Sequence, residues 1–250
     1  MRWVTAQDLQ SWAGRLDAES RLPELVRRLV RATVDVPQKV AFPSGESVQT
    51  GGWDGIVLTT TGNDYVPDGS SGWELSKRAD IKTKADDDYQ KRTADPEHLD
   101  RAKTTYVFLT PRRWNQKEDW IAETKAKAEW ADVRAYDADD LEQWLEHAPA
   151  VGAWLARILH KYPSGVLSID DFWAEYSFGT NPTFTPGMLL TGRKEDAQAA
   201  AEWLKNGSGT LRIAADSPRE ALAFMAASIT SLSAEEQVDF LYAFYRPRTR

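Results

Sequence analysis

An uninterrupted apolar run, TTYVFL at Thr104–Leu109, sets the fold class of this chain. β-branched and aromatic side chains follow one another until Pro111 ends the run, which is typical of a buried strand. Other strand patterns at 47–61, 71–77 and 133–136 are interspersed with helical patterns. The sequence therefore predicts an α/β fold.

Helical patterns surround these strands. Thr5 is the expected cap of a helix ending near Ala13, and an apolar stripe predicts a second helix over 19–34. Further helices are predicted over 79–93 and 116–129, and two more follow the capping pair Asp137 and Asp140. The tryptophans of this region are expected in the core: Trp114, Trp120, Trp130, Trp144 and Trp154.

Composition excludes several kinds of chemistry. The 250 residues include no cysteine, which excludes disulfides, thiolate zinc sites and cysteine nucleophiles, and the 3 histidines have no metal-site spacing. No apolar stretch is long enough to span a bilayer and the first residues form no signal peptide, so we expect a cytoplasmic location. The net charge of -7 is not typical of a dedicated nucleic-acid binder, although basic residues concentrate within 101–127. Carboxylates and lysines are the expected agents of any chemistry.

A linker is predicted near 161–165, so we expect one domain over 1–162 and a smaller βαβα segment over 163–250. This segment is expected to begin with a loop over 168–185. Strands are expected over 188–190 and 210–214, and helices over 195–205 and 218–232.

The predicted order of strands and helices in this smaller segment resembles the beginning of a nucleotide-binding NTPase domain. Its loop at 214–220, however, lacks the glycines and the Gly-Lys-Ser/Thr that hold phosphate. We therefore expect no ATP hydrolysis there. We expect the chain to be the amino-terminal portion of a longer protein or a shortened relative.

Two carboxylates and a lysine form the candidate site in the larger domain. Asp54 lies between glycines on a strand, Glu74 lies on the next strand but one, and Lys84 lies on the helix that follows. Mg²⁺ takes few hard oxygen ligands and keeps its waters, so two carboxylates suit it. Such an ion activates water and stabilises charge on a phosphate. The alternative is that Asp54 is a turn residue and Glu74 a solvated strand residue.

The order of strand Asp, strand Glu-x-Lys and helix resembles the PD-(D/E)xK, or restriction-endonuclease-like, nucleases over about residues 20–160. The segments GGWDG, VPDGSSGWELS, KADDDYQKR, TPRRW and DVRAYDADDLEQWL resemble the amino-terminal effector domain of antiviral STAND-type proteins, which join a nuclease to a nucleotide-binding sensor. The resemblance implies a central mixed sheet flanked by helices and Mg²⁺- or Mn²⁺-dependent cleavage of DNA. It also implies that Asp54 and Glu74 are metal ligands. Glu24 would match an extra acidic residue of many members, although Arg27 and Arg28 stand at salt-bridge spacing from it.

The chain departs from the family pattern at Ser76, which stands where the lysine of Glu-x-Lys is expected. Lys77 follows, but strand alternation directs it to the opposite face. We therefore expect Lys84 to act as a relocated lysine, with Lys77 and Lys82 as the other candidates. The departure leaves open a catalytically inactive module that binds nucleic acid or protein as a scaffold.

Other residues of the larger domain are candidates for contact with the nucleic-acid backbone. Those on the helix are Tyr89 and Arg92, and those near Trp114 are Arg112, Arg113 and Lys117. The last three fit a plain surface equally well. The acidic run 86–88 is expected to be a solvated helix face rather than a second acidic cluster. Because two facing sites would cut both strands of a duplex, we expect a homo-oligomer.

Overall fold

The structure is a computed structural model that describes residues 2–35, 37–43, 52–162, 166–206, 210–232 and 244–245. The chain divides into two compact units, Met1–Lys161 and Tyr162–Arg250. Each unit contains a hydrophobic cluster of its own. All the candidate site residues belong to the first unit, which is described first.

A five-stranded mixed sheet forms the centre of the first unit, in the order β1-β2-β3-β4-β5. β1, β2 and β3 pair antiparallel, and β3, β4 and β5 pair parallel. The strands are β1 (Lys39–Ala41), β2 (Gly55–Thr59), β3 (Gly69–Leu75), β4 (Thr104–Leu109) and β5 (Asp132–Tyr136). The predicted α/β class, with a mixed sheet flanked by helices, is confirmed.

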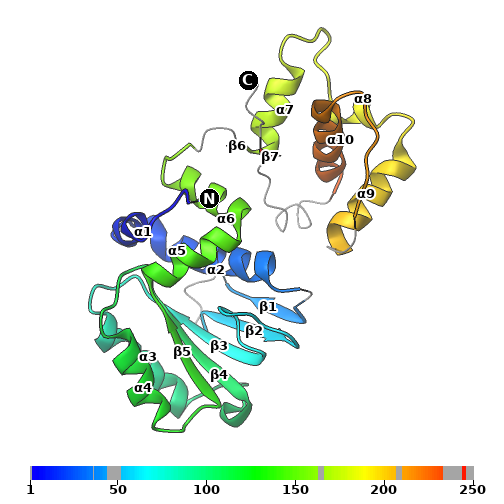
Figure 1. Cartoon of the computed structure of the whole chain (residues 1–250). Coiled ribbons are helices and arrows are strands. Elements are labelled where there is room, and N and C mark those ends of the chain that lie inside the picture. Colours follow the sequence, from blue (N-terminus) through cyan, green and yellow to red (C-terminus); the bar gives the residue numbers. More distant parts are fainter. Residues whose placement is uncertain are drawn as a thin grey trace. The chain divides into compact units, whose positions relative to one another are not determined.

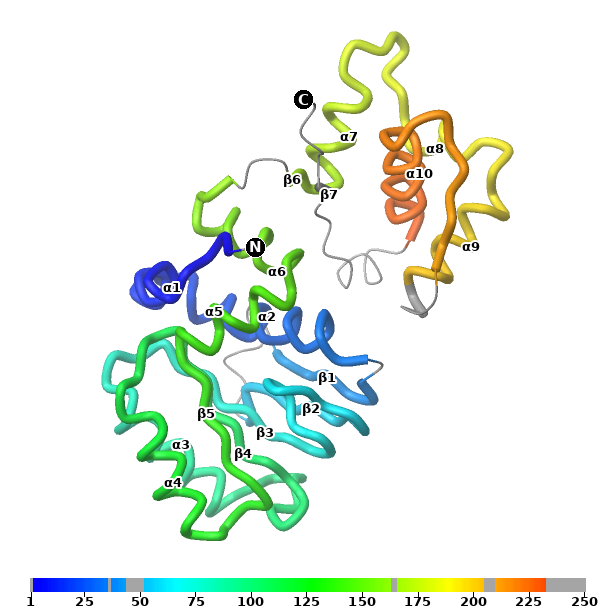
Figure 2. The backbone as a smooth tube through the Cα atoms, in the orientation of Figure 1, coloured from blue at the N-terminus to red at the C-terminus, as the bar shows by residue number. Residues whose placement is uncertain are grey.

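Helices cover both faces of this sheet (Figure 1). The helical elements are α1 (Ala6–Ala13), α2 (Asp17–Thr33), α3 (Ile81–Ala94), the 3₁₀ turn η2 (Arg101–Lys103), α4 (Lys117–Lys125), α5 (Ala138–His147) and α6 (Pro149–Ile158). As the trace in Figure 2 shows, α3 connects β3 to β4 and α4 connects β4 to β5, and these two helices share one face. On the other face, Trp73 of β3 stacks against Trp144 of α5. α2 packs there against α5 and α6.

Local sequence signals specify several of these elements. The strand predicted at Thr104–Leu109 is confirmed with the same bounds, and all its residues are buried. The Asp137 cap with Asp140 is confirmed as a capping box at the start of α5. Of the tryptophans expected in the core, Trp154 is half-buried and the others are buried. β1 was not predicted, because three residues carry too little pattern. The part of the predicted strand 47–61 that precedes Gly52 lies outside the described residues.

The second unit is largely helical in its described part. Its helices are α7 (Ile169–Ser177), α8 (Pro186–Leu190), α9 (Lys194–Asn206) and α10 (Pro218–Thr230). A two-residue strand β6 (Val166–Leu167) pairs antiparallel with β7 (Phe244–Tyr245). No helix in the described ranges has both the length and the apolar character needed to cross a membrane.

The predicted βαβα order of this unit needs correction. Residues 188–190 lie in helix α8, where Pro186 occupies the first turn, and a short apolar run cannot by itself separate strand from helix. Residues 210–214 are irregular, although Leu211 and Ile213 pack on the helices of the unit. The segment expected as a loop contains α7, which begins at the cap Ser168. The two remaining helices, α9 and α10, lie where they were predicted.

Candidate functional site

Asp54 and Glu74 lie together on one face of the sheet. Gly55 of β2 pairs with Trp73 of β3 in an antiparallel register, which places Asp54 opposite Glu74. The Asp54 carboxylate reaches across to β3, where its Oδ2 accepts a hydrogen bond of 2.8 Å from the backbone N–H of Leu75. Because successive strand residues face opposite ways, Trp73 packs toward α5 and Glu74 faces α3. The two predicted metal ligands are therefore neighbours, and they lie at the ends of consecutive strands rather than with another strand between them as expected.

The Glu74 side chain is withdrawn from solvent, with only 5% of the residue exposed. Burial raises the pKa of Glu74 to about 8, and the nearby negative charge of Asp54 acts in the same direction, while Arg92 opposes both. A buried carboxylate with a strongly raised pKa beside a second carboxylate is a frequent property of functional sites.

Arg92, near the carboxyl end of α3, forms an ion pair with Glu74. Its Nε donates a hydrogen bond to Glu74 Oε1. The sequence-based assignment of Arg92 and Tyr89 to the nucleic-acid backbone is therefore corrected, since each residue is only 2% exposed. The Tyr89 ring packs edge-to-face on Tyr106, within the cluster between α3 and the sheet. Neither side chain can reach a duplex from these positions.

Lys84 and Asp88 complete the charged group on α3. Lys84, Asp88 and Arg92 follow at four-residue spacing, so they lie on one face of the helix. Lys84 Nζ donates a hydrogen bond to Asp88 Oδ1. Asp88 is 4% exposed, and burial raises its pKa. The expected solvated face at 86–88 is thus wrong for Asp88, and its four-residue spacing from Lys84 and Arg92 was the signal that could have shown this.

Two buried polar atoms beside the site make no hydrogen bond within the described part of the chain: Asp88 Oδ2 and the hydroxyl of Tyr106. Tyr106 lies on β4 and is fully buried. Its pKa is raised well above the ordinary value, first by burial and then by the charges of Glu74 and Asp88. Buried polar atoms without a protein partner are uncommon, so these two atoms are available to hydrogen-bond a ligand at the site.

The other lysine candidates lie elsewhere. Lys77 Nζ donates a hydrogen bond of 3.0 Å to the carbonyl of Arg15, between α1 and α2, which confirms that it points to the opposite face. Lys82 pairs with Asp86 at 2.8 Å on the solvated side of α3. Ser76, which replaces the expected lysine, accepts a hydrogen bond of 3.2 Å from the N–H of Arg78. Of these lysines, Lys84 is the one that pairs with Asp88, a residue whose charge acts on Glu74.

Glu24 does not belong to this group. It pairs with Arg28 at 2.7 Å, one turn along α2, and Arg28 lies 4.6 Å from the ring centroid of Trp154 in α6. α2 packs on α5 and α6, whereas the carboxylates meet α3 on the other face. The expected catalytic role of Glu24 is therefore corrected in favour of the ion pair on its own helix.

The three remaining basic candidates already have partners. Arg113 pairs with Asp139 at 3.2 Å. Lys117 lies 3.5 Å from Asp137 and also bonds Asp140. Arg112 donates to the carbonyl of Lys77. The charges of Arg113 and Lys117 are thus partly neutralised by carboxylates of the protein, although Arg113 remains exposed to solvent.

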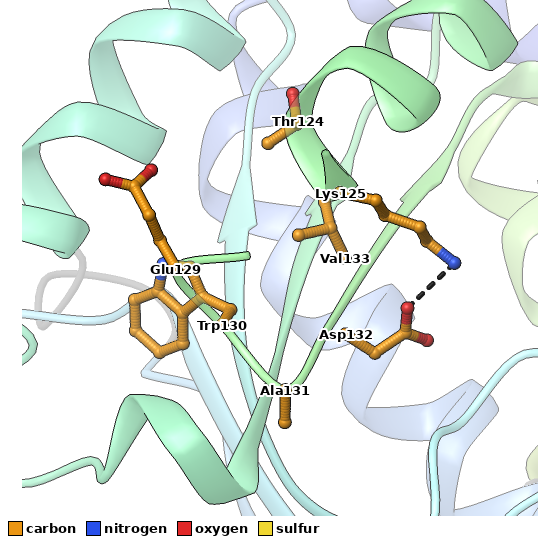
Figure 3. A pocket seen from close by; sticks show the side chains of 7 residues that line it. All are labelled: Thr124, Lys125, Glu129, Trp130, Ala131, Asp132 and Val133. Carbon is orange, nitrogen blue, oxygen red and sulfur yellow. Dashed lines mark ion pairs between the residues drawn. The ribbon is translucent and has the colours of Figure 1, made fainter. Parts of the chain in front are cut away.

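A surface pocket between the end of α4 and the start of β5 contains none of the predicted site residues (Figure 3). Its charged side chains Lys125 and Asp132 pair with each other at 2.7 Å. The pocket lies at the amino end of β5, whereas Glu74 lies near the carboxyl end of β3. It therefore adds nothing to the carboxylate site.

The donor chemistry of the site can be tested against a divalent ion. Within the described ranges, no group of three or more His, Cys, Asp or Glu side chains is placed so that it could hold a metal ion. Asp54 and Glu74 would therefore bind an ion as a pair, with water as the remaining ligands, which is the way Mg²⁺ is commonly held. The oxygen donors fit Mg²⁺ or Mn²⁺, but Arg92 holds one of those oxygens.

Comparison with known proteins identifies no family for this chain. No family model, no curated protein and no solved structure matches it.

Proposed function

We propose that the first unit is a metal-dependent nuclease that hydrolyses phosphodiester bonds in DNA. The observation that supports this most is the placement of Asp54 opposite Glu74, with both carboxylates on the face covered by α3. The restriction-endonuclease-like motifs point to the same chemistry. As part of the same proposal, the protein is the effector part of an antiviral defence system, acts in the cytoplasm, and assembles as a homo-oligomer.

Each residue of the site has a proposed task. Asp54 and Glu74 hold Mg²⁺ or Mn²⁺, which supplies an activated water and stabilises charge on the scissile phosphate. Lys84 provides the ammonium that neutralises charge at that phosphate. Asp88 acts as a positioning residue, because it holds the Lys84 ammonium on the face of α3 that meets Glu74.

Plasmid cleavage by the full chain tests this proposal. We expect cleavage with Mg²⁺ or Mn²⁺ that is lost in Asp54→Asn and Glu74→Gln. Glu24→Gln is the matched control, because Glu24 lies in an ion pair on the opposite side of the sheet and its variant should cleave normally. Equal cleavage by the wild type and both site variants would remove the assignment.

A second candidate is a nuclease-fold module that binds nucleic acid or protein without cutting. Two observations favour it: Ser76 stands in the place of the expected lysine, and Arg92 pairs with Glu74. This candidate predicts salt-sensitive DNA binding and no cleavage with either metal. Binding by gel shift and cleavage of the same DNA, measured in parallel, separate the two candidates.

A further inference from the structure

The guanidinium of Arg92 is enclosed by four groups. Its Nε pairs with Glu74, its Nη1 donates to Glu97 Oε1 at 2.7 Å, and its Nη2 donates to the carbonyl of Gly52. Its Cζ lies 4.9 Å from the ring centroid of Trp53. Gly52 has a φ of 127°, a conformation that residues with a side chain rarely adopt. The backbone that receives Arg92 therefore depends on a glycine.

Three of these partners adjoin the candidate metal site or belong to it. Gly52 and Trp53 directly precede Asp54 in the chain, and Glu74 lies opposite Asp54. Two neighbouring carboxylates, one of them buried, repel each other when both are ionised, and a cation between or beside them offsets this repulsion. In this structure the Arg92 guanidinium is the cation beside Glu74, which is one of the two proposed metal ligands.

We infer that Arg92 is an internal cation that competes with the divalent ion for Glu74, so that the metal binds only when the guanidinium leaves this carboxylate. The inference rests on the proposed function, since it concerns the regulation of the same site. Binding of the metal and pairing of Arg92 with Glu74 are then mutually exclusive. The affinity for the metal is lowered by the fraction of molecules in which Arg92 is paired.

The surroundings of Arg92 allow such an exchange. Glu97, beyond the end of α3, has a side chain that is 30% exposed and already bonds the same guanidinium. After Glu74 is released, Glu97 and the Trp53 ring still provide a carboxylate and an aromatic face for the positive charge. Arg92 lies two residues before the end of α3 at Ala94, so its side chain can shift without moving the centre of the helix.

Arginine side-chain NMR of the full-length wild type tests the inference directly. The Nε–H signal of Arg92, assigned by its loss in Arg92→Lys, should shift and exchange faster with water as Mg²⁺ is added. The signal of Arg28 is the internal control, because Arg28 also pairs with a glutamate and lies over a tryptophan, on the other face of the sheet. We expect the Arg28 signal to stay in place.

Mn²⁺ binding, followed by the EPR signal of the free ion at pH 8.5, provides the second measurement. Arg92→Gln should bind Mn²⁺ at least about tenfold more tightly than the wild type, while Arg28→Gln should match it. Binding by Arg92→Gln alone, with none by the wild type, would also support the competition.

The outcomes separate the inference from the proposed function. If the wild type binds the metal through Glu74, as shown by loss of binding in Glu74→Gln, and the Arg92 signal does not move, the competition is refuted and the nuclease proposal survives. If neither the wild type nor Arg92→Gln binds Mn²⁺ in a Glu74-dependent way, the metal site itself is refuted.

Discussion

Two arginine–glutamate pairs in this protein have the same chemistry in different surroundings. In the Arg92–Glu74 pair the side chains are 3% and 6% exposed, and in the Arg28–Glu24 pair they are 14% and 24% exposed. A buried charge that loses its partner is costly, whereas a solvated pair contributes little to stability. Burial, rather than the residue types, gives Glu74 its perturbed pKa.

The raised pKa of Glu74 predicts how stability changes with pH. Its value rises from 4.5 to about 8 on folding, so the folded state binds this proton more tightly than the unfolded state. The contribution of this proton to the free energy of unfolding is fully present below pH 4.5 and is lost as the pH rises through about 8. Between these values the free energy of unfolding should fall, by up to about 1.4 kcal/mol per pH unit from this group.

Urea denaturation of the wild type and Glu74→Gln from pH 5 to pH 8.5 measures this effect. The free energy of unfolding of Glu74→Gln should change less with pH than that of the wild type, because the variant has no proton to release at this position. Parallel curves for the two proteins would show that Glu74 titrates at its ordinary pKa.

Helix caps contribute unequally to the first unit. The Asp137 carboxylate accepts hydrogen bonds from the N–H groups of Asp139 and Asp140, and also from that of Trp114 at 3.0 Å. The Thr5 hydroxyl accepts one backbone bond in its own helix, from Asp8. Asp137 therefore joins α5 to the segment that follows β4, whereas Thr5 caps α1 alone.

We expect Asp137→Ala to destabilise the protein by about 2 kcal/mol and Thr5→Ala by about 1 kcal/mol. Urea denaturation at neutral pH measures both losses of stability. Because each variant removes one helix cap, the difference between the two losses reports the additional contacts of Asp137. Equal losses would mean that the bond to Trp114 contributes nothing.

Gly72 of β3 allows Trp53 to lie against the sheet beside the site. A Cβ at this position would lie 2.7 Å from the Trp53 ring and 2.8 Å from Leu99. Gly72→Ala should therefore displace Trp53 and lower the free energy of unfolding by about 1–3 kcal/mol. The control is Gly187→Ala in α8, where a Cβ meets nothing within 4 Å. Denaturation curves should show no loss for the control, and an equally stable Gly72→Ala would contradict the packing.

The two compact units differ in how each buries apolar surface. The first unit packs aromatic residues of α3 and α4 on the sheet, and the second buries small and aromatic residues among its helices. A unit with its own core is expected to fold by itself.

A chain ending at Lys161 should therefore fold and unfold cooperatively. Its melting temperature, measured by circular dichroism, should coincide with one of the transitions of the full chain. A fragment that stays unfolded, or that melts at a clearly lower temperature, would show that the first unit depends on the rest of the chain.

Local patterns predicted much of the first unit. The strand Thr104–Leu109, the caps Thr5 and Asp137, and the helices around them depend on neighbouring residues alone, so the sequence was sufficient. The second unit was predicted less well, because its short apolar segment at 188–190 fits a strand and a helix equally. That choice depends on partners that are distant in the chain.

By itself, the sequence determined the α/β class, and its motifs singled out Asp54 and Glu74 as candidate site residues. Only the tertiary structure decided which charges meet there. In the folded protein Arg92 and Asp88 are buried beside the site and Glu24 lies on the opposite face of the sheet. Lys77 donates a hydrogen bond to the carbonyl of Arg15. The physical reason is that periodicity assigns a side chain to a face of its own element, while burial and ion pairing depend on what other elements place against that face.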